Sequence, residues 1–243
     1  MTKKLIINAD DFGYCKGVNY GIIEAHIDGV LTSTTLMANM PGFEHAVELS
    51  SQHPNLGVGV HLMLTTGRPV LTDLTTIVDA EGNFRNQLYY KNTFSIDQEE
   101  VYNEWKAQIE KVLAAGIQPT HIDTHHHAYL FGDFNEIYWK LADEYHLPVR
   151  NNFHNQDPIR RTTDGFLYTM ETAIQSEEAL DQLFTTHDSV EIMCHPAFLD
   201  QFLLASSSYT YPRTEELELL TDLATKELFS TQEEIELATF RSM

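Results

Sequence analysis

Aspartates and histidines stand at a few narrow places along this chain. Asp10 and Asp11 are adjacent near the N-terminus, while His61 and His195 lie far from them in the sequence. One carboxylate can hold a divalent cation while its neighbour takes a proton from the water that the cation activates. Because imidazole as a group exchanges its proton near neutral pH, the side chain of His195 is a candidate acid for protonating a leaving amine. These residue types predict metal-assisted hydrolysis.

The densest cluster of such residues is the segment 121–127, which reads His-Ile-Asp-Thr-His-His-His. In an extended chain alternate residues share a side, so we expect His121, Asp123 and His125 to face the same way. The segment can then supply a metal ligand and a carboxylate that orients it. One aspartate and two histidines from three strand ends would leave coordination positions open for water and substrate. A nonspecific histidine-rich metal tract is the alternative interpretation.

Short apolar runs that alternate with helical patterns must position these residues. We expect strands at 4–9, 34–39, 56–62, 119–123, 147–151 and 189–194, and the partial alternation of 234–240 favours a last strand. We expect helices at 18–27, 41–49, 97–116, 133–145 and 212–228, and a short helix that Ser176 opens. This order predicts an α/β fold of right-handed βαβ units around a parallel sheet, forming a TIM-type barrel that is incomplete or distorted.

The candidate residues follow four of these expected strands at their carboxyl ends. Parallel α/β folds place their active sites at that face. Residues 65–96 interrupt the alternation with Gly67, Pro69 and Gly82, so we predict a loop insertion there. The full span 1–243 is predicted to be a single catalytic domain.

Composition excludes several classes of protein. The formal net charge of −21 argues against binding to nucleic acid or to an anionic membrane. The apolar run before Asp10 is too short for a signal peptide or a membrane span. Cys15 and Cys194 are the two cysteines, without a CxxC motif, which is typical of reduced thiols in a cytosolic enzyme. We therefore expect a cytoplasmic protein.

The motifs around these residues resemble the YdjC-like carbohydrate deacetylases, and within them the chitooligosaccharide deacetylases. The matching segments are Asn-Ala-Asp-Asp-Phe-Gly at 8–13, Thr-Ser-Thr-Thr at 32–35, Gly-Val-His-Leu at 59–62, Pro-Thr-His-Ile-Asp-Thr-His-His-His at 119–127 and Cys-His-Pro at 194–196. They run in order over nearly the whole chain. Thr124 stands where a serine is usual, and the insertion at 65–96 differs in detail, which leaves the sugar open.

The resemblance implies a (βα) barrel-like deacetylase fold, often dimeric, with one divalent metal ion that is commonly Mg²⁺. It implies that Asp11, His61 and His125 ligate the metal, with Asp10 as general base and His195 as acid. Two imidazole ligands would instead favour Zn²⁺, Co²⁺ or Mn²⁺. We expect hydrolysis of the N-acetyl group of an amino sugar or short chitooligosaccharide, as in chitin degradation, with acetate released.

Other residues are candidates for supporting the site or the substrate. These are His121, Asp123, His127 and Arg150, and a phosphate on the sugar would be met by Arg150 or Arg68. One alternative is another metal-dependent barrel hydrolase, either an amidohydrolase or a phosphoesterase with two ions about 3.5–4 Å apart. The second is a sugar-binding or regulatory protein without turnover, which would not need Asp10, Asp11 and the histidines together.

Overall fold

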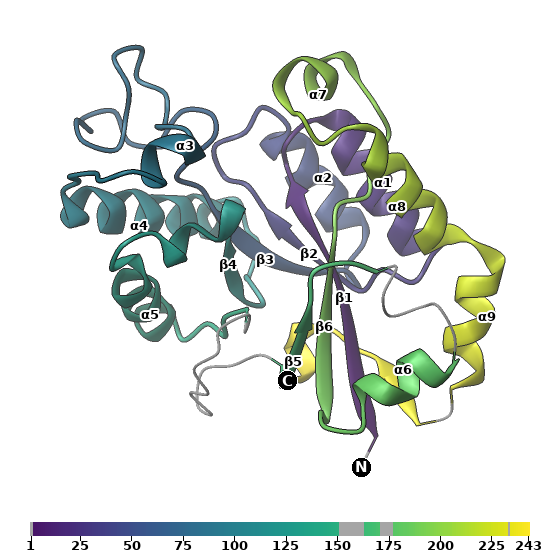
Figure 1. The fold of residues 1–243 in the computed structure, drawn as a ribbon. Helices are drawn as coiled ribbons and strands as arrows, with labels where there is room; N and C mark the ends of the chain where they lie inside the picture. Colours follow the sequence, from purple (N-terminus) through teal and green to yellow (C-terminus); the bar gives the residue numbers. More distant parts are fainter. Residues whose placement is uncertain (1, 151–162, 171–176, 233) are drawn as a thin grey trace.

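A parallel β-sheet forms the centre of the molecule and curls into a half-barrel with helices on its outer face (Figure 1). The computed structural model describes residues 2–150, 163–170, 177–232 and 234–243. The strand order is β4-β3-β2-β1-β6-β5, and β7 also pairs with β1. The strands are β1 (Lys3–Phe12), β2 (Ser33–Leu36), β3 (Gly57–Leu62), β4 (Ile122–Thr124), β5 (Gly165–Leu167), β6 (Ser189–Cys194) and β7 (Ile235–Leu237).

All pairs in this sheet are parallel, and within the described part of the chain no ladder joins β4 to β5. The predicted α/β barrel-like fold is therefore confirmed in its incomplete form. The helices are α1 (Lys16–Ile27), α2 (Phe43–Gln52), α3 (Gln87–Tyr90), α4 (Gln98–Ala114), α5 (Phe134–Tyr145), α6 (Glu177–Leu183), α7 (Gln201–Ser206), α8 (Tyr211–Thr221) and α9 (Leu223–Thr231).

The alternation of side chains along β1 separates the outer core from the barrel interior. Leu5 and Ile7 join the large core beneath the helices, whereas Ile6 packs inside the barrel with Ala238 and Phe240. Both faces of the strand are thus buried, which explains its continuous apolar run. Polar residues at the carboxyl end of β1 consequently emerge at the open end of the barrel.

One predicted strand needs correction. The segment 147–151 forms no strand among its described residues, because only one bridge joins Val149 to Ile122. Pro148 has no backbone N–H to give to a ladder, and Asn151 lies outside the described residues. Ser176, the expected start of the short helix, also lies outside them, although α6 begins at the next residue.

The long helix predicted at 212–228 is two helices, α8 and α9. The chain is extended at Asp222, with ψ of 143°, and the Asp222 carboxylate accepts hydrogen bonds from the N–H groups of Ala224 and Thr225. This aspartate therefore caps a new helix where the apolar spacing runs on without a break.

The insertion at 65–96 is bound to α4 by two carboxylates one helical turn apart. Glu104 accepts hydrogen bonds from the N–H groups of Val70 and Leu71 at 2.8 and 2.9 Å. Glu100 accepts from the N–H and hydroxyl groups of both Thr75 and Thr76 at 2.7–2.9 Å. The insertion carries the short helix α3 and is held in place against α4.

The C-terminal tail closes the lower end of the barrel. The strand β7 pairs with the first residues of β1, and the chain then turns inward so that the Phe240 ring stacks on His121, with centroids 3.6 Å apart. The predicted last strand is confirmed for Ile235–Leu237 only. None of the helices in the described ranges is long and apolar enough to cross a lipid bilayer.

Candidate active site

A bulge in β1 turns two adjacent carboxylates toward one point. Neighbouring residues of a regular strand face opposite sides, but the register of β1 against β2 shifts between Ala9 and Phe12. Asp11 adopts the left-handed region, with φ of 72°. His61 Nε2 consequently lies 3.9 Å from an Asp10 oxygen and 3.5 Å from an Asp11 oxygen. The bulge thus aims both side chains at the same place, at a cost in backbone strain.

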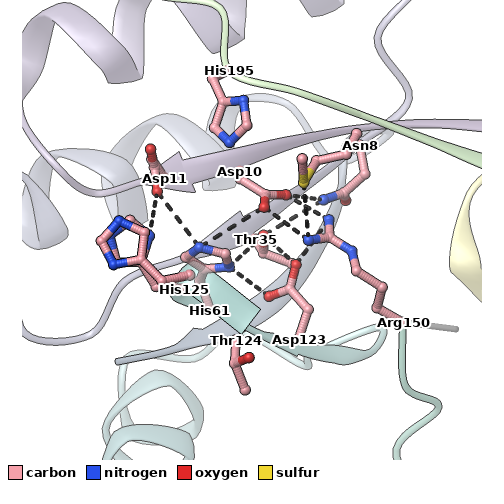
Figure 2. A network of polar contacts seen from close by, with 12 residues as sticks. Asn8, Asp10, Asp11, Thr35, His61, Asp123, Thr124, His125, Arg150 and His195 are labelled. Atoms are coloured by element: carbon pink, nitrogen blue, oxygen red, sulfur yellow. Dashed lines mark hydrogen bonds and ion pairs between the residues drawn. The ribbon is translucent and has the colours of Figure 1, made fainter. Parts of the chain in front are cut away.

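His61 is held by groups on its other nitrogen (Figure 2). Its Nδ1 lies 2.6 Å from Asp123 Oδ1 and 3.2 Å from Thr35 Oγ1, and Thr35 donates to the other Asp123 oxygen. Nδ1 therefore carries the proton that Asp123 accepts, and Nε2 is the nitrogen that a cation would bind in place of its proton. Burial lowers the pKa of His61, but the Asp123 and Asp10 carboxylates outweigh it and raise this pKa to about 10. A positive charge is strongly favoured at this point.

The Asp11, His61 and His125 side chains have the arrangement of a metal site. Their ligand atoms all lie within 4.8 Å of one another. Asp11 Oδ1 and His61 Nε2 are buried and have no hydrogen-bond partner among the described residues, and His125 Nδ1 lies 3.2 Å from Asp11 Oδ1. Buried polar atoms without partners are costly unless an ion satisfies them. The donor set of one carboxylate and two imidazoles therefore fits a divalent cation.

The segment after β4 separates the three consecutive histidines. His126 and His127 are both left-handed, with φ of 56° and 51°, so the chain turns sharply after His125. Only His125 enters the metal cluster, while His126 Nδ1 lies 2.9 Å from Thr65 Oγ1. His127 lines the neighbouring cavity, 5.5 Å from the Tyr168 ring. His121 stacks on Phe240 and contacts Thr120, so it belongs to the barrel interior.

Asp10 is bound by a buried guanidinium. Arg150 reaches both Asp10 oxygens, at 2.5 and 2.8 Å, and also lies 2.9 Å from Asp123 and 2.8 Å from Glu191. Burial raises the pKa of Asp10, but the charge and hydrogen bonds of Arg150 outweigh it and lower this pKa strongly. Arg150 is fully buried. It therefore has no surface left for a substrate phosphate, which corrects that expectation and places Arg150 behind the carboxylate.

A second arginine neutralises the candidate ligand Asp11. Arg213 of α8 donates to Asp11 Oδ2 at 2.6 Å, which leaves Oδ1 for the cluster. Burial raises the pKa of Asp11, and the charges of Arg213 and His125 outweigh it, so the pKa lies well below its ordinary value. The carboxylate is thus ionised at any pH at which the protein would work.

A cavity of about 430 Å³ lies beside these residues. Asp10, Asp11 and His125 line it, and His195 approaches it from the end of β6, with its ring directed at the two aspartates (Figure 2). The insertion contributes Thr66 and Gln87 to the wall. The Tyr90 and Phe94 rings of the insertion pack instead against Phe131 and Phe134.

Sequence patterns missed several of the residues that line this cavity or lie behind it. Arg213 and Tyr209 have no local signal, because their role depends on how α8 and the residues before it pack beside α1. Glu191 did have a local signal, because a carboxylate inside the apolar strand 189–194 must be buried and needs a partner. In the structure Glu191 is buried and its partner is Arg150.

Comparison with known proteins identifies the family to which this sequence belongs. The model of the YdjC-like protein family matches residues 4–231. The chain belongs to the YdjC-like family. Within it, a carbohydrate deacetylase from Brevibacillus brevis is 45% identical and covers 99% of both chains. A chitooligosaccharide deacetylase from Yersinia enterocolitica is 40% identical, covering 93% of this chain and 94% of its own.

A solved structure shares the whole fold of this YdjC-like chain. A proposed cellobiose-phosphate cleavage protein from Enterococcus faecalis V583 superposes with a TM-score of 0.89 at 38% identity, covering 100% of this chain and 99% of its own. The resemblance expected from the sequence motifs is therefore confirmed over nearly the full length. Four of the five motifs reach the carboxyl ends of β1, β3, β4 and β6, whereas the motif at 32–35 covers the start and middle of β2.

Proposed function

We propose that this protein is a metal-dependent deacetylase that hydrolyses the N-acetyl group of an amino sugar or short chitooligosaccharide and releases acetate. The observation that carries the proposal is the buried cluster of Asp11, His61 and His125, flanked by Asp10 and His195. Such a cluster supplies ligands, a base and an acid around one cavity. The names of the relatives in Brevibacillus and Yersinia support the deacetylase chemistry and a carbohydrate substrate.

The cation would be held by Asp11 Oδ1, His61 Nε2 and His125 Nδ1. When bound, a divalent cation lowers the pKa of water and polarises the acetamide carbonyl. The two imidazoles favour Zn²⁺, Co²⁺ or Mn²⁺, whereas family resemblance favours Mg²⁺. Restoring each metal in turn to the stripped protein decides between them.

Asp10 accepts the proton of the attacking water in this mechanism. Arg150 and Asn8 fix its carboxylate, with the Asn8 amide donating to Asp10 Oδ1 at 3.1 Å. Each carboxylate oxygen has two lone pairs, so these contacts leave room for a further proton donor. Because Arg150 makes Asp10 a weak base, Asp10 suits a water molecule that is already acidified.

His195 donates a proton to the departing amine in the second step. As the C–N bond of the tetrahedral intermediate breaks, the nitrogen takes the imidazole proton, the free amine leaves and acetate forms. The ring reaches the cavity from the end of β6, across from His61 of β3 and His125, which directly follows β4. Acid and base therefore approach the acetamide from different strands.

The same geometry favours one ion over two. Asp10, His61 and Asp123 form a second group with metal-like spacing, but the Arg150 guanidinium already lies between Asp10 and Asp123. A cation beside it would be repelled. This arrangement supports a single-ion hydrolase more than a two-metal phosphoesterase.

Acetate release from N-acetylglucosamine, diacetylchitobiose and their 6-phosphates tests the proposal. Chelator-stripped protein should be inactive, should regain activity with Mg²⁺, Mn²⁺, Co²⁺ or Zn²⁺, and should lose it in Asp10→Asn. Asp73→Asn, which changes an exposed aspartate of the insertion, is the control and should keep the wild-type rate. Absence of acetate with every metal and sugar would contradict the proposal.

A further inference from the structure

A carboxylate of α8 lies directly behind His195. Glu216 Oε2 accepts the backbone N–H of His195, and Glu216 Oε1 lies 3.9 Å from His195 Nδ1. The backbone contact fixes the start of the segment after β6. The backbone contact does not require the second Glu216 oxygen to approach the ring. This approach suggests that Glu216 also acts on the His195 side chain.

Tyr209 holds the Glu216 carboxylate in this orientation. Its hydroxyl donates to Glu216 Oε1 at 2.5 Å, and its ring lies 5.6 Å from the His195 ring with an edge-on geometry. The Tyr209 carbonyl in turn accepts from Arg213 Nε at 2.8 Å, and Arg213 also donates to Asp11. Tyr209 thus fixes the same Glu216 oxygen that approaches the His195 ring, and Arg213 of the same segment braces the candidate metal ligand.

We propose that Glu216 is a positioning residue that orients the His195 imidazole, with Nδ1 toward Glu216 and Nε2 toward the scissile acetamide. The inference rests on the proposed role of His195 as the acid. A carboxylate behind Nδ1 favours the orientation in which the other nitrogen faces the substrate, as carboxylates do for other catalytic imidazoles.

The test compares Glu216→Gln with Glu215→Gln, a change of the exposed neighbour on the same helix. The glutamine keeps an oxygen for the His195 N–H and removes the charge. We expect kcat for acetate release from diacetylchitobiose to fall on the order of 10-fold to 100-fold in Glu216→Gln. KM, metal affinity and melting temperature should stay close to wild type, and Glu215→Gln should be unchanged throughout.

A double mutant separates positioning from a structural role. The residual rate of His195→Ala is measured by following acetate release over a day. If Glu216 acts through His195, adding Glu216→Gln to this variant should not lower that residual rate further. The inference would be overturned if the fold-losses of the two single variants multiplied in the double variant. A wild-type kcat in Glu216→Gln would overturn it as well. If Glu216→Gln does not fold, Tyr209→Phe removes only the hydroxyl; its smaller loss should likewise vanish in the His195→Ala background.

The two proposals fail in different ways. If the wild type releases no acetate, or His195→Ala keeps the full rate, then the proposed function or the acid assignment is wrong. If His195→Ala loses activity while Glu216→Gln does not, only the inference about Glu216 is wrong.

Discussion

At the scale of single residues, Asp123 orients groups of the candidate site without belonging to the candidate ligand set. Asp123 lies outside the candidate ligand set, yet its carboxylate fixes His61 Nδ1 at 2.6 Å and shares Arg150 with Asp10. It therefore determines which nitrogen of His61 is free and how basic that nitrogen is. Thr35 restrains both groups through one hydroxyl.

Asp123→Asn should weaken metal binding by about 10- to 100-fold, because an amide cannot neutralise the His61 ring or hold its tautomer as well. Titration of the stripped protein with Zn²⁺ or Mn²⁺ in a calorimeter measures the change. Asp73→Asn is again the matched control. An unchanged affinity in Asp123→Asn would show that His61 does not depend on this carboxylate for its orientation.

At the scale of elements, α4 determines the position of the insertion. Glu100 and Glu104 lie on the face of α4 that meets residues 70–77 and accept hydrogen bonds from that segment. Partial burial raises the pKa of Glu100, but hydrogen bonds from Thr75 and Thr76 outweigh it and lower this pKa to about 2. Since Thr66 and Gln87 line the cavity, the same anchors hold part of its wall.

Glu100→Gln should loosen the insertion at pH 6 but not at strongly acidic pH. A carboxyl whose pKa is lower in the folded state than its ordinary 4.5 stabilises the fold above that value, and the contribution is lost as pH falls toward 2. At pH 6 the amide hydrogens of residues 70–77 should exchange faster in the variant than in the wild type. The difference between the two exchange rates should be smaller at pH 3.5.

The control for this comparison is Glu99→Gln, which changes the exposed preceding residue. It should match the wild type at both pH values. A difference between Glu100→Gln and wild type that is independent of pH would exclude the ionised carboxylate as the anchor.

At the scale of the whole molecule, the two ends of the half-barrel have separate tasks. The carboxyl ends of the strands carry the candidate site, and the C-terminal tail fills the other end with Phe240, which is 2% exposed. His121 lies between them, and burial lowers its pKa to about 3, so it packs there as a neutral ring. The homodimer and the single domain stay predictions. Sedimentation velocity would measure whether the protein is a dimer in solution.

Phe240→Ala should lower the free energy of unfolding by about 3–5 kcal/mol, because it empties a packed position between Ile6, Ala238 and His121. Urea unfolding of the metal-free protein measures the loss. Met243→Ala removes a side chain that is 43% exposed and should have little effect. Because the candidate ligands lie at the other end, metal affinity should survive; its loss would show that the two ends are coupled.

The local patterns of the sequence were enough for most of the parallel strands, though not for β5, and for the residues at the strand ends. Apolar runs mark β1, β3 and β6 because these strands are buried on both faces, and parallel strands bring their carboxyl ends to one edge. The candidate residues Asp10, Asp11, His61, His125 and His195 follow from that rule together with the motifs. The confirmed family and fold rest on the same features.

Only the tertiary structure decided how these residues act on one another. The left-handed Asp11, the two left-handed histidines and the break at Asp222 depend on contacts with neighbouring strands and helices. Arg150, Arg213 and Glu216 come from segments far from the motifs and meet them only where the chain packs. Periodicity records which face of an element is buried, but the partner of a buried charge is set by long-range packing, which no local pattern contains.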